Sequence, residues 1–203
     1  MKLFYTPGAC SLAPHIVLRE LGLPFKLVRV DQSTKTTSEG QDYFSIAPCG
    51  YVAALQLADG NVLNEGSTIL EYLADLKPEA SLAPPAGSWE RVKMRERLSF
   101  LSCELNSTMN PLWKEVIPDG VKQIFRMRLF KRFDVLDKEV AGSHYQLAGT
   151  FSIADAYLFT MLRWPKRLGF SLEPWPALRQ FQSRVESRPS VCESLAAELS
   201  AQD

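Results

Sequence analysis

The sequence predicts an α/β domain followed by an all-helical domain. Strand-like and helix-like segments alternate over the first 76 residues. The stretch KPEASLAPPAGS at 77–88 then holds three prolines and no sustained periodicity, which is typical of a linker. Beyond it, apolar residues recur only at helical spacing. We therefore expect domains at 1–77 and 89–203, joined by a linker at 78–88.

The N-terminal domain is predicted to begin with a βαβ unit. Residues 2–5 read as a strand that ends at a Pro-Gly break. Ser11 can cap a helix that runs to about Leu21, with Gly22 placed to end it. Residues 25–30 alternate apolar and basic side chains, which favours a second strand.

A hairpin and a helix complete this domain. We expect a short helix at 42–46, strands at 52–57 and 61–63, and a helix at 66–76. Asp59-Gly60 between the strands favours a two-residue type I′ turn, in which both residues take positive φ. The resulting order, βαβ-α-ββα, resembles the thioredoxin-like fold.

The C-terminal region is predicted to contain helices alone. They are expected at 89–110, 121–140, 152–168, 176–187 and 189–199. Ser152 and Asp155 have the spacing of a capping box, with Phe151 and Ala156 as its hydrophobic staple. This pattern concerns folding rather than chemistry.

Composition excludes several classes of protein. Twenty-three basic and 23 acidic residues cancel, so we expect neither nucleic acid nor an anionic membrane as partner. No run reaches the roughly 18 apolar residues of a membrane span, and no signal peptide precedes the first strand, which predicts a cytoplasmic protein. Four scattered cysteines without a CxxC pair, and two histidines, favour neither a metal site nor a disulfide framework.

Four segments make the chain resemble the bacterial, beta-class glutathione transferases. They are MKLFYTPGACSL at 1–12, NEG at 64–66, EYLAD at 71–75 and FSIADAYLF at 151–159. The resemblance implies glutathione as cosubstrate without a metal, a homodimer, a role in detoxification, and a pocket for a small hydrophobic electrophile between the domains.

Cys10 is the first candidate catalytic residue. It lies between the Pro-Gly turn and a helix start, where N–H groups and the helix dipole stabilise a negative sulfur, so a lowered thiol pKa is expected. The alternative is a small buried side chain. The resemblance implies that Cys10 lies against the glutathione sulfur. The Ser11 hydroxyl is a further donor at the same helix start.

The resemblance also assigns the glutathione-binding residues. Glu65 would bind the ammonium and the N–H of Gly66 the carboxylate of the γ-glutamyl group, although Glu65 alone also suits a helix dipole. Val52 would pair with the cysteinyl backbone, beside Tyr51, and Lys35 would reach the glycine carboxylate unless it is simply solvated. The remaining candidate contacts are Ala9, Cys103, Ser107 and Trp164, the last of which also suits core packing.

The chain departs from the family pattern at several of these positions. Ala53 stands where the family has a proline after a cis bond, so the bond after Val52 is either cis or trans. Asn106 replaces a histidine near the glutathione sulfur; it still donates a hydrogen bond but carries no charge. Cys103 and Ser107 also differ from the family.

The leading interpretation is therefore an enzyme that conjugates the glutathione thiolate to small apolar electrophiles. A second interpretation is a glutathione-dependent thiol, disulfide or peroxide reductase with Cys10 as nucleophile. A third is a non-catalytic binding or dimerisation module. Met109, Leu112 and Trp113 favour an apolar cosubstrate, or else belong to the core.

Overall fold

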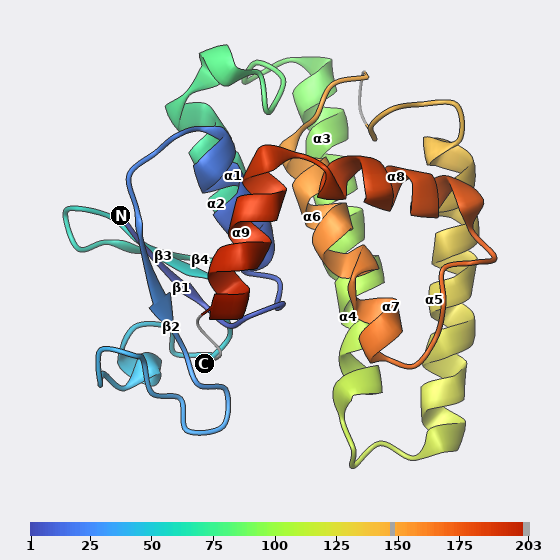
Figure 1. Ribbon diagram of the computed structural model, residues 1–203, viewed down its shortest axis with the longest axis horizontal. Coiled ribbons are helices and arrows are strands. Elements are labelled where there is room, and N and C mark those ends of the chain that lie inside the picture. The colour runs from blue at the N-terminus through green and yellow to red at the C-terminus, as the bar shows by residue number, and fades with distance from the viewer. Residues whose placement is uncertain (147–148, 201–203) are drawn as a thin grey trace. The chain divides into compact units, whose positions relative to one another are not determined.

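The computed structural model describes residues 1–146 and 149–200, which form two compact units (Figure 1). The first unit contains residues 1–83 and 187–200, and the second contains residues 84–186. The sequence places 187–200 in the helical domain, whereas in the structure α9 (Pro189–Ser200) packs against α1 (Leu12–Glu20). Hydrophobic periodicity identifies a helix but not the partner on which it packs.

A four-stranded sheet with the order β2-β1-β3-β4 organises the first unit. Its strands are β1 (Lys2–Tyr5), β2 (Lys26–Arg29), β3 (Ala54–Gln56) and β4 (Val62–Asn64). β1 and β2 are parallel because α1 connects them, whereas β3 pairs antiparallel with both β1 and β4. The expected βαβ-α-ββα order is therefore present, with the short helix as a 3₁₀ turn at Tyr43–Ser45.

The core of this unit lies on both faces of the sheet. α1 and α2 (Gly66–Leu76) pack together, and Figure 1 shows α1, α2 and α9 beside the same face. Ile69, Leu70 and Leu73 are fully buried, as their helical spacing predicts. A second cluster contains Phe4, Val28, Val30, Tyr43, Ala47, Val52 and Ala54, with Ala9 packed against it.

The β3–β4 hairpin is present, but its turn differs from the prediction. Leu57 N–H donates to Asn61 C=O at 2.8 Å, so the loop between them has three residues. Gly60 has φ +90°, whereas Asp59 does not take positive φ, which excludes a type I′ turn. The Asp59 carboxylate instead accepts a hydrogen bond from Asn61 N–H at 3.0 Å.

The second unit is helical in the described part of the chain. Its helices are α3 (Trp89–Phe100), α4 (Ser107–Met109), α5 (Asp119–Val140), α6 (Ile153–Leu162), α7 (Trp164–Arg167) and α8 (Pro176–Glu186). A π-helical segment, Leu101–Asn106, joins α3 to α4, and a 3₁₀ turn, Asn110–Trp113, follows. α8 packs on both α5 and α6 (Figure 1).

Two helices predicted as continuous change their winding or break. The helix expected at 89–110 turns from α to π at Leu101. The helix expected at 152–168 breaks at Arg163, because Pro165 has no N–H to continue the hydrogen-bond ladder. The predicted capping box is present: the Asp155 carboxylate accepts the Ser152 backbone N–H at 2.9 Å and its hydroxyl at 2.6 Å.

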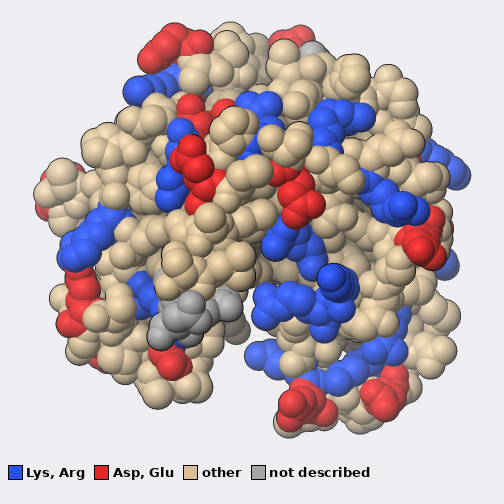
Figure 2. Space-filling model, viewed as in Figure 1, with Lys and Arg blue, Asp and Glu red and all other residues tan. Residues whose placement is uncertain are grey.

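Charged side chains of both signs are interspersed over the face drawn in Figure 2, with a local gathering of Lys and Arg near α7. Across residues 1–146 and 149–200, no helix is both long and apolar enough to cross a membrane.

Candidate active site

The loop between β1 and α1 places a cysteine directly before a helix. Gly8 has φ +69°, a conformation that glycine adopts without steric cost, and Ala9 N–H closes the turn on Thr6 C=O at 3.0 Å. Leu12 N–H then donates to Ala9 C=O at 3.1 Å. Cys10 therefore lies at the start of the helix, as the sequence predicts.

The pKa of Cys10 is raised in this structure, contrary to the expected lowered pKa. Its Sγ–H donates to Val52 C=O at 2.9 Å. Burial raises the pKa of Cys10 to about 11, the N–H groups of Cys10, Ala53 and Ser11 oppose this increase, and the negative charge of Glu65 adds to it. Loss of water around the sulfur outweighs the stabilisation by N–H groups on which the sequence argument depended.

The Ser11 hydroxyl is used inside the loop. Ser11 is fully buried, and its Oγ accepts Thr6 N–H at 3.2 Å and lies 3.3 Å from Thr6 C=O. It makes no side-chain cap on α1, contrary to the expected N-cap. This geometry does not direct the hydroxyl at a ligand. The group that Ser11 directs at the Cys10 sulfur is its backbone N–H.

Side chains from a separate segment hold the carbonyls of the loop before β3. Lys35 Nζ donates to Gly50 C=O at 2.9 Å, and the Tyr43 hydroxyl donates to Tyr51 C=O at 2.9 Å. With the Cys10 bond to the next carbonyl, three consecutive carbonyls are each fixed by a side chain. The sequence did not single out Tyr43, whose local signal is an aromatic pair with Phe44 in a mostly polar stretch.

Val52 lies in the loop directly before β3. The Val52-Ala53 bond is cis, which is one of the two geometries that the sequence left open. Within the described residues, the Val52 N–H makes no hydrogen bond. The Tyr51 side chain beside it is 67% exposed.

Glu65 and Gly66 lie at the start of α2. Glu65 has φ +69° and an exposed side chain, and it makes no side-chain cap. Positive φ is unfavourable for glutamate, and such outliers cluster at functional sites. The negative charge of Glu65 contributes to the raised pKa of Cys10. The first N–H groups of α2, beginning at Gly66, have no partner within the helix.

Three of the four candidates in the helical unit lie in or directly after its π-helical segment. Cys103 is exposed, Asn106 is half-buried, and the Ser107 hydroxyl donates to Cys103 C=O. Such π-helical turns occur often at functional sites. Trp164 begins α7 and is buried, with its ring edge-on to Trp113 at 6.2 Å.

The three residues considered for an apolar substrate differ in how deeply they are buried. Met109 is fully buried and Leu112 is 8% exposed, so both belong to the core. Trp113 is 37% exposed, with the guanidinium of Arg167 over its ring at 5.1 Å.

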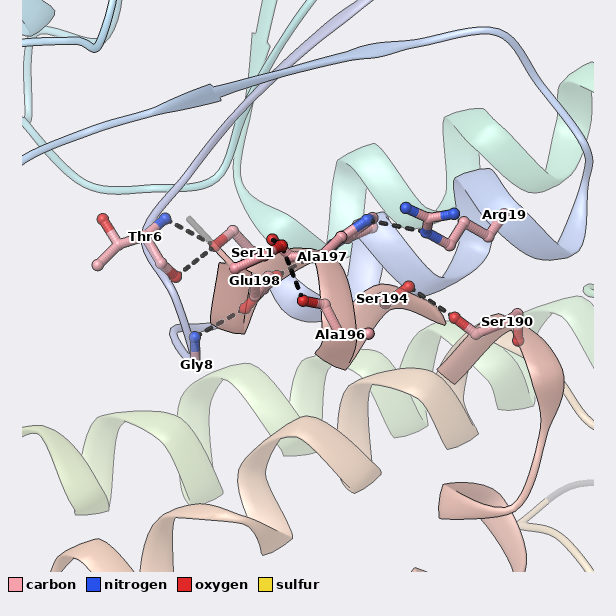
Figure 3. Close-up of polar contacts among 11 residues, drawn as sticks. Thr6, Gly8, Ser11, Arg19, Ser190, Ser194, Ala196, Ala197 and Glu198 are labelled. Carbon is pink, nitrogen blue, oxygen red and sulfur yellow. Dashed lines mark hydrogen bonds and ion pairs between the residues drawn. The ribbon is translucent and has the colours of Figure 1, made fainter. Parts of the chain in front are cut away.

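A buried network on α9, which the sequence analysis missed, supports the cysteine loop (Figure 3). Glu198 Oε2 accepts Gly8 N–H at 2.8 Å, and Oε1 lies 3.1 Å from His15 Nδ1. Arg19 Nε donates to His15 Nε2 at 3.0 Å, so Nδ1 carries the imidazole proton and donates to Glu198. No local sequence signal connects residues this far apart in the chain.

All four cysteines are free thiols, and Cys49, Cys103 and Cys192 are exposed. In the described ranges, no group of three or more His, Cys, Asp or Glu side chains lies close enough to hold a metal ion.

Comparison with known proteins gives full-length matches. The model of the glutathione S-transferase N-terminal domain matches residues 8–76, and that of the C-terminal domain matches residues 119–189. Glutathione S-transferase GstA of Escherichia coli O157:H7 is 42% identical over 98% of each chain. Glutathione S-transferase GST-4.5 of Xanthomonas campestris is 33% identical over 98% of each chain.

Solved structures match equally well. The ternary complex of BphK, a bacterial glutathione transferase, has a TM-score of 0.96 at 45% identity and covers 98% of this chain and 99% of its own. A sphingomonad glutathione S-transferase complexed with glutathione has a TM-score of 0.95 at 41% identity over 98% of each chain. A beta-class transferase of Sphingomonas chungbukensis has a TM-score of 0.95 at 42% identity, also over 98% of each chain.

Proposed function

This chain belongs to the bacterial beta class of the glutathione S-transferase family, and on that premise we propose that the loop before α1 activates glutathione. The enzyme conjugates glutathione to electrophiles. What we propose is which residues perform this reaction.

The observation that carries the proposal is the set of N–H groups around the Cys10 sulfur. Those of Cys10, Ser11 and Ala53 all favour a negative charge there. A glutathione thiolate beside Cys10 would receive the same stabilisation at the start of α1. Cys10 itself, with its pKa raised to about 11, stays protonated at neutral pH, and its S–H turns from Val52 C=O to donate to that thiolate when glutathione binds.

The chemical step is a nucleophilic attack by the glutathione thiolate. The sulfur forms a bond to the electrophilic carbon, and in a substitution the leaving group departs with its electron pair. Fixing both reactants converts a bimolecular encounter into a reaction within one complex. A small apolar electrophile fits the proposal, because the exposed ring of Trp113 offers an aromatic surface in the helical unit.

The remaining contacts position the tripeptide. Glu65 takes the γ-glutamyl ammonium, and the first N–H groups of α2, from Gly66, take its carboxylate. Val52 pairs through its unbonded N–H with the cysteinyl backbone. Lys35 has three N–H donors, of which two bond Gly50 C=O and Gln32 Oε1, leaving one for the glycine carboxylate. Ala9 and Tyr51 lie beside the bound tripeptide.

We also propose roles for the candidates in the helical unit, because the family resemblance implies them. Asn106 supplies an amide donor but no proton, and Cys103, Ser107 and Trp164 supply contacts. The family also implies a homodimer, which we place on the outer face of α3, where Trp89 is 70% and Val92 46% exposed.

Thiol exchange through Cys10 is the weaker function. Its nucleophile is the thiolate, which a pKa of about 11 leaves scarce at neutral pH. We place the enzyme in the cytoplasm, because a reducing compartment maintains four free thiols.

Calorimetric titration with glutathione and conjugation of chlorodinitrobenzene test the proposal together. We expect glutathione to bind at one site per chain and Cys10→Ala to keep much of the conjugation rate while losing any mixed-disulfide formation. Absence of glutathione binding by the wild-type chain would refute the proposed site. Total loss of conjugation in Cys10→Ala, with glutathione binding intact, would refute the role given to the N–H groups.

A further inference from the structure

We propose that the Tyr43 hydroxyl is a positioning group that sets the affinity for glutathione by holding the backbone of the loop before β3. This inference rests on the proposed function, since it takes the Val52 backbone as the surface that pairs with glutathione. In this proposal Tyr43 acts through the backbone that it holds, since its hydroxyl donates to Tyr51 C=O.

Core packing, its place in a capped 3₁₀ turn and a hydrogen bond all fix the position of Tyr43. It is fully buried in the cluster that includes Phe4, whose ring centroid lies 5.8 Å from its own. It begins the 3₁₀ turn Tyr43–Ser45, which the Asp42 carboxylate caps by accepting Phe44 N–H at 3.0 Å. Its hydroxyl donates to Tyr51 C=O at 2.9 Å. Burial raises the pKa of Tyr43, so the hydroxyl is a neutral donor throughout the working pH range.

Tyr51 depends on this bond for its position. Its side chain is 67% exposed and therefore packs little. The next residue, Val52, presents the unbonded N–H to which the peptide pairs. Because Tyr51 C=O and Val52 N–H belong to one peptide unit, which is planar, fixing the carbonyl also fixes the direction of that N–H.

The Lys35 and Tyr43 side chains that bond this loop come from one segment, whose ends are hydrogen-bonded to each other. Tyr43 backbone N–H donates to Lys35 C=O at 2.8 Å, so Lys35 and Tyr43 are joined to each other as well as to the loop. Lys35 Nζ fixes Gly50 C=O, and the Tyr43 hydroxyl fixes the following carbonyl. Such a loop is held in its binding conformation before glutathione arrives, which reduces the ordering cost of binding.

Loss of this hydroxyl should weaken binding without slowing the chemical step. The contact acts on the peptide backbone, which is held alike in the ground and transition states, so its loss raises KM and leaves kcat unchanged. Tyr43→Phe removes the hydroxyl and keeps the ring against Phe4. Since one neutral hydrogen bond contributes about 0.5–1.5 kcal/mol, we expect glutathione to bind about twofold to twelvefold more weakly.

The experiment compares Tyr43→Phe with Tyr157→Phe in the full-length enzyme. Tyr157 is also buried, and its hydroxyl lies 3.3 Å from Ser102 Oγ in the helical unit, so its loss controls for a buried tyrosine hydroxyl as such. Calorimetry measures the glutathione Kd and the fraction of competent sites, and chlorodinitrobenzene kinetics give KM and kcat. We expect only Tyr43→Phe to raise Kd and the glutathione KM, with kcat within about twofold of wild type.

A second readout uses hydrogen exchange of the loop in the glutathione-free enzyme. Amides at 50–53 should exchange several-fold faster in Tyr43→Phe and at the wild-type rate in Tyr157→Phe. If Tyr43→Phe folds poorly, Asp42→Ala, which removes only the exposed cap of the turn, should give a smaller change in the same direction.

The outcomes separate this inference from the proposed function. If the wild-type enzyme binds glutathione and both tyrosine variants bind it equally well, the positioning role is wrong and the proposed function stands. A loss of competent sites at unchanged Kd would show that Tyr43 serves stability alone. If the wild-type enzyme binds no glutathione, the proposed function itself fails.

Discussion

The carboxylate of Glu198 accepts a hydrogen bond of 2.8 Å from the backbone N–H of Gly8, which ties the last helix to the loop that carries Cys10. Its other oxygen lies 3.1 Å from Nδ1 of His15. Glu198 is 3% exposed, and these hydrogen bonds offset the cost of burying its charge. The position of the loop therefore depends on a residue 190 positions away.

Glu198→Gln keeps the size of the side chain and removes its charge. We expect the free energy of unfolding to fall by about 2 kcal/mol, because hydrogen bonds to charged groups contribute about 1.5–3 kcal/mol. Urea unfolding measures this change. Glu193→Gln on the same helix, where the carboxylate is 61% exposed beside Arg19, is the control and should change stability by less than about 0.5 kcal/mol. Equal effects would contradict a specific role for Glu198.

Cys10 should react slowly with alkylating agents in the folded enzyme. Its pKa is raised to about 11, against about 8.5 in an unfolded chain. In a background with the other three cysteines changed to serine, iodoacetamide should alkylate folded Cys10 on the order of 100-fold more slowly than unfolded Cys10 at pH 7.5. A rate that already reaches its plateau below pH 9 would exclude the raised pKa.

The same shift predicts how stability changes with pH. The folded state keeps the Cys10 proton to higher pH than the unfolded state, so the contribution is fully present below about pH 8.5. It is lost as pH rises through about 11. Cys10→Ala should lack this part of the alkaline loss, as urea unfolding at a series of pH values will measure.

Glu65→Gln should have two measurable effects, one on glutathione binding and one on the pKa of Cys10. Losing the partner of the γ-glutamyl ammonium should weaken glutathione binding about tenfold, since hydrogen bonds to charged groups contribute about 1.5–3 kcal/mol. The pKa of Cys10 should fall, because the Glu65 charge helps to raise it. Calorimetry and the alkylation profile measure the two effects. Glu79→Gln, an exposed acidic residue in the same unit, should produce neither. Unchanged affinity would remove Glu65 from the site.

Trp89→Glu should shift the proposed dimer toward the monomer. A 70% exposed tryptophan beside exposed Val92 is an apolar patch that a second copy would cover, and a charge in its centre opposes burial. Sedimentation equilibrium measures the association state. Val116→Glu, at a position that is 87% exposed and outside the helices, is the control. A dimer that persists in Trp89→Glu would place the interface elsewhere.

Asp155→Ala should destabilise the helical unit by about 2–3 kcal/mol. It removes the acceptor of the Ser152 N–H and hydroxyl and of Gln146 N–H at 2.8 Å, and leaves the two Ser152 donors buried without this partner. Thermal and urea unfolding measure the loss. Asp119→Ala removes an acidic residue from the first turn of α5, where only the helix dipole is affected, and should cost less than about 1 kcal/mol. Equal losses would contradict the capping box.

Local patterns in the sequence predicted most of the elements and several of the candidate residues. The apolar spacing of α2 predicted its bounds, Gly66–Leu76, and the Ser152–Asp155 pair predicted the start of α6. These predictions succeed because the causes lie within one or two turns of chain. The turn at Asp59 was predicted wrongly, since the same dipeptide also fits a three-residue loop whose hydrogen bonds are set by the pairing of Leu57 with Asn61.

What the sequence determined by itself was the order of strands and helices and the place of Cys10 at a helix start, because dihedral preferences and hydrophobic periodicity act over a few residues. Only the tertiary structure decided that burial raises the pKa of this thiol, that Tyr43 holds Tyr51, and that Glu198 holds Gly8. Burial and hydrogen-bond partners are properties of the packed chain. They bring together groups that no local spacing connects.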